Sequence, residues 1–149
     1  IAWDRGNMLG SPRLIQEKMV KLEDLPAIVE ALSRSTDKVS YAAIAFTTPD
    51  RPDPNDALNL NMSLESGKVG FDWVLLGQSN IEDARKFTEF ARKQGIEPTR
   101  RSMNGVSYLR VENLDTAKFA TNVITDMYQL PDDVSLSLYH EGFDLPANQ

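Results

Sequence analysis

The sequence predicts an α+β fold, a two-layer sandwich in which an antiparallel sheet of about five or six strands carries helices on one face. Two pairs of strand-like segments are each joined by a tight turn, at Ser66-Gly67 and at Asn104-Gly105. Amphipathic segments of helical periodicity separate these strand runs. The 149 residues suit one domain: we expect residues 1–22 to form an N-terminal arm or short helix and residues 23–145 a single α+β body.

The predicted order is helix, three strands, helix, two strands, helix and strand. Ser11-Pro12 is a possible start for a short helix, and Asp24-Leu25-Pro26 starts a firmer one that ends near residues 33–37. Residues 39–47 are apolar on both alternating faces, which predicts a strand covered on both sides. Residues 48–57 hold three prolines and three aspartates and form a loop, whose spacing is not that of a calcium loop. We therefore expect no metal there.

The first hairpin has the clearest pattern. A two-residue turn at Ser66-Gly67 places Glu65 opposite Lys68 and, further along, Asn61 opposite Asp72. The opposite face then collects eight large apolar side chains, those of Leu58, Leu60, Met62, Leu64, Val69, Phe71, Trp73 and Leu75. Antiparallel sheets often keep one face in water, so we expect the polar face of this hairpin to be wet.

In the rest of the chain, predicted helices continue to alternate with predicted strands. Ser79 and Glu82 predict a capping box for a helix that runs to Gln94, with Gly95 at its C-terminal cap. The inward stripe of that helix is Ile81, Ala84, Phe87 and Ala91. The second hairpin pairs residues 97–103 with 106–111, an amphipathic helix spans 114–130 up to Pro131, and the short strand at 134–139 suits a sheet edge.

Charge favours a protein partner over nucleic acid or membrane. Sixteen basic and 22 acidic residues give a net charge of −6, which opposes binding to nucleic acid or to anionic lipid. Residues 111–149 hold one basic and seven acidic residues, which predicts an acidic surface for a basic partner. The predicted contact residues are Asp126, Asp132, Asp133, Glu141 and Asp144.

The sequence lacks the residues that several kinds of site require. No cysteine is present, which excludes disulfides, thiolate zinc sites, iron–sulfur clusters and thiol catalysis. We expect the single histidine, His140, to be a partly exposed structural residue. No phosphate-binding or dinucleotide-binding motif occurs, so no cofactor is expected. No apolar run is long enough to span a membrane, and the lack of cysteine and of a signal sequence favours the cytoplasm.

Two candidate sites remain beside the acidic surface. Asp72 lies between Phe71 and Trp73 in the chain, and a carboxylate in such surroundings is a candidate acid or base for a small hydrolytic or ligand-binding domain. The second candidate is an anion site on the second hairpin, where the predicted register sets Arg101 opposite Tyr108. Its residues are Arg100, Arg101, Tyr108 and Arg110.

The order of elements, the size and the acidity resemble the class I type III secretion chaperones and related small bacterial proteins, over roughly residues 24–130. The resemblance implies a dimer that holds an extended partner segment on apolar grooves, without catalytic machinery. The expected function is therefore a non-enzymatic, acidic protein-binding module, chaperone-like or adaptor, with a homodimer as a candidate assembly. An immunity-type inhibitor of a basic partner and the small ligand-binding or hydrolytic domain stay open as alternatives.

Overall fold

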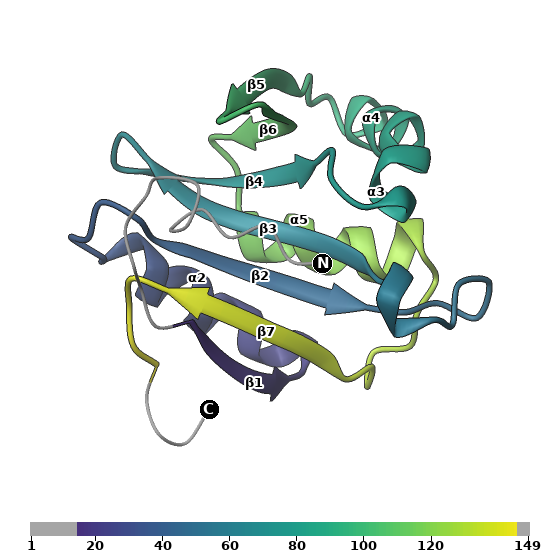
Figure 1. The fold of residues 1–149 in the computed structure, drawn as a ribbon, viewed down its shortest axis with the longest axis horizontal. Coiled ribbons are helices and arrows are strands. Elements are labelled where there is room, and N and C mark those ends of the chain that lie inside the picture. Colours follow the sequence, from purple (N-terminus) through teal and green to yellow (C-terminus); the bar gives the residue numbers. More distant parts are fainter. Residues whose placement is uncertain (1–14, 146–149) are drawn as a thin grey trace.

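The computed structural model describes residues 15–145 and contains an antiparallel sheet of seven strands (Figure 1). Across the sheet the strands follow the order β1-β7-β2-β3-β4-β6-β5. Their bounds are Gln16–Val20 for β1, Tyr41–Phe46 for β2, Leu58–Glu65 for β3, Lys68–Val74 for β4, Thr99–Met103 for β5, Val106–Glu112 for β6 and Leu136–Glu141 for β7. The predicted α+β class is confirmed, whereas the sheet is larger than the expected five or six strands.

The helices pack against one face of this sheet. They are α2 (Leu25–Ser33), α3 (Gln78–Glu82), α4 (Ala84–Lys93) and α5 (Thr116–Asn122), which continues as the π-helical segment η3 (Val123–Met127). Two 3-10 turns, η1 (Leu22–Asp24) and η2 (Pro54–Asp56), lie in the connections. Side chains of α2, α4, α5 and η3 share one core with the apolar face of the sheet, where the Phe87 ring stacks on Trp73 at 4.8 Å. Within residues 15–145 no helix is long and apolar enough to cross a membrane.

Both hairpins have the register expected from their turns. Glu65 pairs with Lys68 and Asn61 with Asp72 in the first hairpin, and Arg101 pairs with Tyr108 in the second. The β3–β4 ladder ends at the Asn61–Asp72 pair, so the pairs expected beyond it do not form. The apolar side chains there nevertheless face the same core, as the sheet pattern requires; they are Leu58, Leu60 and Trp73.

The N-terminal prediction is wrong where the structure can test it. Gln16–Val20 is a strand and not part of a short helix, with Met19 exposed and Val20 buried. It pairs antiparallel with β7, with Val20 opposite Leu136. Strand β7 therefore lies between β1 and β2. The position at a sheet edge that was predicted from its sequence is wrong. The proposed helix start at Ser11-Pro12 lies outside the described residues.

The capping box predicted for the third helical segment does not form. Gly77, with a φ of 85°, precedes the first turn, and the Ser79 hydroxyl donates to the Asp56 carbonyl oxygen at 2.7 Å. The segment divides into α3 and α4 at Asp83, and Ile81 is 56% exposed instead of lying in the core. Helix α3 is thus short and separate from α4, and polar contacts, not a stripe of apolar side chains, hold it against the sheet.

Asn80 makes the main polar contact between α3 and the sheet. Its side chain accepts from the Asn59 N–H at 3.0 Å and donates to the carbonyl oxygens of Asn59 and Val74 at 2.9 and 3.1 Å. Its own carbonyl oxygen accepts from the Trp73 indole at 2.8 Å. This buried asparagine satisfies backbone groups that would otherwise lack partners where β3 begins and β4 ends.

Candidate functional site

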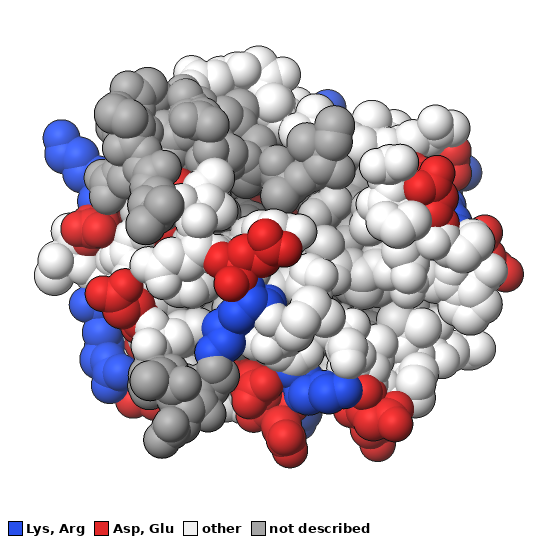
Figure 2. Space-filling view, turned by 60° about the horizontal axis from the view of Figure 1, so that its bottom comes forward, with Lys and Arg blue, Asp and Glu red and all other residues white. Residues whose placement is uncertain are grey.

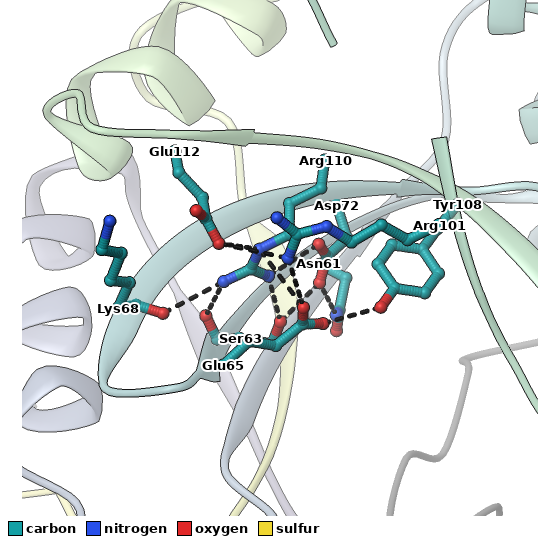
Figure 3. Close-up of polar contacts among 9 residues, drawn as sticks. All are labelled: Asn61, Ser63, Glu65, Lys68, Asp72, Arg101, Tyr108, Arg110 and Glu112. Atoms are coloured by element: carbon teal, nitrogen blue, oxygen red, sulfur yellow. Dashed lines mark hydrogen bonds and ion pairs between the residues drawn. The ribbon is translucent and has the colours of Figure 1, made fainter. Parts of the chain in front are cut away.

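A cluster of ionisable side chains lies on the sheet face opposite the helices (Figure 3). It joins β3, β4, β5 and β6, since Asp72 of β4 pairs with Arg110 of β6 as well as with Asn61 of β3. The members of this Arg110 cluster are Asn61, Ser63, Glu65, Asp72, Arg101, Tyr108, Arg110 and Glu112. The two candidate sites on the sheet, around Asp72 and around Arg101 and Arg110, are therefore one site.

The guanidinium of Arg110 lies at the centre of the cluster and is fully buried. Its Nη1 donates to Asp72 Oδ1 at 2.8 Å and to Ser63 Oγ at 2.7 Å, and its Nε donates to Glu112. Its Nη2 donates to the carbonyl oxygens of Lys68 and Ser63 at 3.0 and 3.2 Å. Since charge-assisted hydrogen bonds run to two carboxylates, this arginine has the partners that a buried charge needs.

The space for this guanidinium depends on Gly70 of β4. A Cβ atom at position 70 would lie 2.5 Å from Arg110 Cζ and 2.7 Å from its Nη2. Cβ atoms do not come this close to other heavy atoms in proteins. Any residue other than glycine at position 70 must therefore displace the guanidinium of Arg110. The lack of a side chain at Gly70 is therefore part of the cluster.

The charges of the cluster stabilise one another. Burial disfavours the charged form of Arg110, but the nearby carboxylates, Asp72 first, outweigh it and raise the pKa of the guanidinium. The hydrogen bond from Arg110 holds the pKa of the Glu112 carboxyl below its usual value. Asp72 accepts further hydrogen bonds from Asn61 at 3.0 Å and from the Ser63 hydroxyl. Arg110 and Glu112 are thus held in their charged forms near neutral pH.

Glu65 extends the cluster toward the second hairpin. Its carboxylate accepts from Arg101 Nη1 at 2.7 Å and from the Tyr108 hydroxyl at 2.8 Å. The cluster therefore sets the two arginines, 101 and 110, against three carboxylates. No positive charge is left over for an anionic ligand. The remaining residue of the predicted anion site, Arg100, is exposed and lies one position along β5, so its side chain points to the opposite face.

The polar face of the first hairpin is buried, contrary to expectation. Asn61 is 2% exposed, while Ser63 and Asp72 are 0% exposed. These residues need no bulk water because they pair with one another and with Arg110 across neighbouring strands. Asp72 is hence out of reach of a substrate in solution, and its carboxylate is held in place by Asn61, Ser63 and Arg110.

His140 is also buried, not partly exposed as expected. It is 2% exposed, its Nδ1–H donates to the Phe143 carbonyl oxygen at 3.1 Å, and the two rings lie 5.0 Å apart. Burial lowers the pKa of the imidazole below its ordinary value, and the Phe143 hydrogen bond offsets this only in part. A neutral histidine results, in a structural position inside β7.

The predicted acidic contact residues do not form one patch. Asp132 and Asp133 precede β7 and are exposed, whereas Asp144 follows β7 at its other end. A strand of six residues separates the two groups by roughly 17–20 Å. Glu141, expected to contact the partner, is instead only 1% exposed, and a side chain buried at the end of β7 beside β2 does not offer its charge to a partner. Asp126, on η3, is exposed.

The fold brings a second acidic segment next to Asp126, Asp132 and Asp133. Phe46 pairs with Leu58, and Ala45 with Ser137, so the loop of residues 47–57 lies at the same end of the sheet as the segment 126–135. Together these two segments, here called the acidic end, hold six aspartates and one arginine; the aspartates are Asp50, Asp53, Asp56, Asp126, Asp132 and Asp133. Figure 2, which brings the β1 side forward, shows acidic and basic side chains interspersed on that side, without a large area of one sign. On the face shown, the charges therefore do not form one acidic surface.

A cleft of about 700 Å³ opens between the two segments of the acidic end. Its lining residues are Thr48, Pro49, Asp50, Arg51, Asp83, Lys86, Met127, Tyr128 and Gln129. Arg51 donates to both oxygens of Asp83, at 2.7 and 3.0 Å, and to Glu82 at 3.0 Å. The one arginine of the acidic end is therefore already neutralised within the chain.

Asp83 and Tyr128 connect α4 to the end of η3. The Tyr128 hydroxyl donates to Asp83 Oδ2 at 2.6 Å, and the Tyr128 ring meets Phe46 edge-on at 5.6 Å. Burial would raise the pKa of Asp83, but the hydrogen bonds from Arg51 and Tyr128 outweigh it and lower that pKa. Burial and the bond to Asp83 raise the pKa of Tyr128, so the phenol keeps its proton.

This cleft was not predicted from the sequence. Its residues come from three segments that are far apart in the chain, and only the aspartates of the loop stand out, as a rejected calcium pattern. Within the part of the chain that the structure describes, no three histidine or carboxylate side chains converge to hold a metal ion. The sequence does show two acidic segments. That they lie at the same end of the sheet follows only from the pairing of β2 with β3 and β7.

Comparisons with protein-family models, with curated protein sequences and with solved structures give no match for this chain.

Proposed function

We propose that this chain is a non-enzymatic, acidic protein-binding domain that docks a basic surface of its partner on the acidic end. The observation that carries the proposal is the meeting of two aspartate-rich segments, residues 47–57 and 126–135, around one cleft. Chaperone-like and adaptor roles are both forms of this proposal. They differ in what the bound partner does next.

The ion pairing of the acidic end supports a partner outside the chain. Among residues 15–145, Asp50, Asp132 and Asp133 form no ion pair with a basic side chain. Lys21 approaches Asp133 but donates to its backbone carbonyl oxygen, at 2.8 Å, and leaves the carboxylate open. Like charges held together at a surface repel one another, and a basic partner relieves this repulsion.

The Arg110 cluster supports the non-enzymatic part of the proposal. Catalytic acids and bases need contact with the substrate, whereas Asp72 and Arg110 are buried and bonded to each other. Their arrangement fits a structural role, because it ties β6 to β3 and β4. Acid–base chemistry at Asp72, the alternative considered from the sequence, receives no support from this geometry.

The test is affinity capture from a lysate of the native host with three proteins compared side by side. The first is the unchanged chain. The second carries Asp126→Lys, Asp132→Lys and Asp133→Lys. The third is a control with the same change of charge at exposed glutamates outside the acidic end, Glu30→Lys, Glu89→Lys and Glu97→Lys. We expect one protein, identified by mass spectrometry, to be retained by the first and third and lost from the second.

Salt provides an independent measure. Electrostatic docking weakens as ionic strength rises, so the same protein should elute between about 0.1 and 1 M salt. Equal retention by all three proteins, or retention that salt does not alter, would contradict the proposal. If the captured partner has an activity of its own and loses it in the complex, the chain acts as an immunity-type inhibitor through this same surface.

A further inference from the structure

The cleft at the acidic end has features that select the partner's side chain. It lies between residues 48–51 of the loop and residues 127–129 at the end of η3, and its volume of about 700 Å³ exceeds what one side chain fills. A long side chain with a short stretch of its backbone is the size of occupant that suits it.

One wall of the cleft is an aromatic face that already holds a cation. Lys86 Nζ of α4 lies 4.7 Å from the centroid of the Tyr128 ring. The hydroxyl of that ring is fixed by Asp83, and its edge contacts Phe46, so the ring is held in place from two sides. Lys86 itself is exposed, which leaves it free to move away when another cation approaches.

The second wall carries negative charge. Helix α5 and η3 together run from Thr116 to Met127 and end at the cleft, where the carbonyl ends of a helix carry a partial negative charge. Gln129, with a φ of 56°, turns the chain away there. Across the cleft lies Asp50, which is exposed and forms no ion pair within residues 15–145.

The arginine of the cleft lining, Arg51, is neutralised by two carboxylates of the chain. Arg51 binds Asp83 through both of its terminal nitrogens, and Glu82 takes the remaining contact, so this guanidinium has no spare charge for an anion. Lys86, whose charge also lowers the pKa of Asp83, is the other cation of the lining, and it lies beside Asp50, the helix end and the electron-rich Tyr128 face. The balance favours a positively charged occupant.

We infer that the cleft is an anchor pocket for an arginine side chain of the protein partner, which takes the place of Lys86 on the Tyr128 ring and donates to Asp50. Arginine fits better than lysine because its planar guanidinium stacks on an aromatic face and still directs hydrogen bonds outward in its plane. The inference rests on the proposed function, since it names the group by which the acidic end holds its partner.

The test is a titration of the full chain, followed through its backbone amide signals by nuclear magnetic resonance. The probes are N-acetyl-arginine amide, the lysine analogue and the citrulline analogue, which keeps the shape of arginine but has no charge. We expect millimolar binding of the arginine probe, with shifts of the amides of Asp50, Tyr128 and Gln129. The lysine probe should bind several-fold more weakly, and the citrulline probe about tenfold more weakly or not at all.

Two variants separate this pocket from general attraction to an acidic surface. Asp50→Asn should weaken the arginine probe about three- to tenfold, while the control Asp132→Asn, outside the cleft lining, should change it less than twofold. Lys86→Gln should strengthen binding about two- to fivefold, because it removes the competing cation. A merely electrostatic surface would respond alike to the two aspartate changes.

The inference is overturned if arginine and citrulline bind equally, if the shifts lie outside the cleft, or if Lys86→Gln weakens binding. These outcomes are distinct from failure of the proposed function. A partner that is captured in an Asp126, Asp132 and Asp133-dependent way while the arginine probe leaves the cleft unchanged refutes the pocket alone. Arginine binding in the cleft without any captured partner refutes the protein-binding role and, with it, a partner's arginine as the occupant, while the preference of the cleft for arginine stands.

Discussion

Replacement of Gly70 by alanine should destabilise the protein although alanine suits a strand better than glycine. The new Cβ would lie 2.5 Å from Arg110 Cζ, 2.7 Å from Nη2 and 2.8 Å from Nε. The guanidinium must therefore move. It is the end of a flexible side chain, but every direction of movement lengthens hydrogen bonds to Asp72, Glu112 or Ser63 in a buried site.

The magnitude follows from the bonds that are lost. Leaving one partner of a buried ion pair alone costs about 3–5 kcal/mol, and a displaced guanidinium keeps part of its contacts. Alanine in place of glycine restores about 0.4–1 kcal/mol by restricting the unfolded chain. We therefore expect Gly70→Ala to lower the free energy of unfolding by about 2–3 kcal/mol.

The assay is urea denaturation of four proteins: the unchanged chain, Gly70→Ala, Arg110→Met and the double variant. Arg110→Met alone should cost about 3–5 kcal/mol, since Asp72 loses its buried partner. Adding Gly70→Ala to Arg110→Met should then cost nothing further, because the space of the guanidinium is vacant. The coupling free energy between the two positions should be about 2 kcal/mol or more.

The reasoning fails if Gly70→Ala costs less than about 0.5 kcal/mol, or if it costs the same in both backgrounds. If Arg110→Met does not fold, Arg110→Lys provides a second background. The ammonium of lysine lacks the planar fork that fills the space beside position 70, so the cost of Gly70→Ala should fall by at least half in it. An unchanged cost there would refute the steric explanation.

Three further predictions concern other positions. Gly142→Ala should cost more than about 2 kcal/mol, because its Cβ would lie 2.1 Å from the Val39 carbonyl oxygen at a φ of 91°. The control Gly105→Ala, at a φ of 82° but with open space around it, should cost about 1 kcal/mol in the same thermal unfolding assay, and equal costs would count against the steric argument. Burial lowers the pKa of His140 from its ordinary value of 6.5, so the unfolded chain takes up this proton first on acidification. The free energy of unfolding should be level above that pH and fall as the pH drops through the lower folded value, and His140→Gln should lack this part of the slope in denaturation curves collected from pH 7.5 to 5. Asn80→Ala should cost about 2–4 kcal/mol in urea denaturation, because it leaves the Asn59 amide and two carbonyl oxygens buried without partners; a loss under 1 kcal/mol would mean that water replaces the side chain.

The features that were predicted correctly are local. Ser66-Gly67 and Asn104-Gly105 define two-residue turns, and alternation on either side of a turn leaves one register that puts the apolar residues on one face. Helix α2 and the helix that starts at Thr116 follow in the same way from their own periodicity. Each of these predictions depends on residues fewer than about twenty positions apart, so no knowledge of the rest of the chain was needed.

The features that were missed depend on which strands lie side by side. Gln16–Val20 is a strand because β7 is there to pair with it, and its five residues alone are too few to separate strand from helix periodicity. Asp72 and Arg110 were each noticed, but their ion pair forms only because β4 pairs with β6, 38 residues further along the chain. The acidic end arises in the same way, from the pairing of β2 with both β3 and β7.

The sequence by itself thus determined the turns, the registers of the two hairpins, the apolar face of the sheet and the surplus of negative charge. The tertiary structure alone decided that the polar face of β3 and β4 is buried, that Arg101 and Arg110 have no charge to offer, and that six aspartates meet at one end. The physical reason is the range of the interactions. Turn conformation and side-chain alternation act between near neighbours in the chain, whereas the burial and neutralisation of a charge depend on whichever distant segment the fold places beside it.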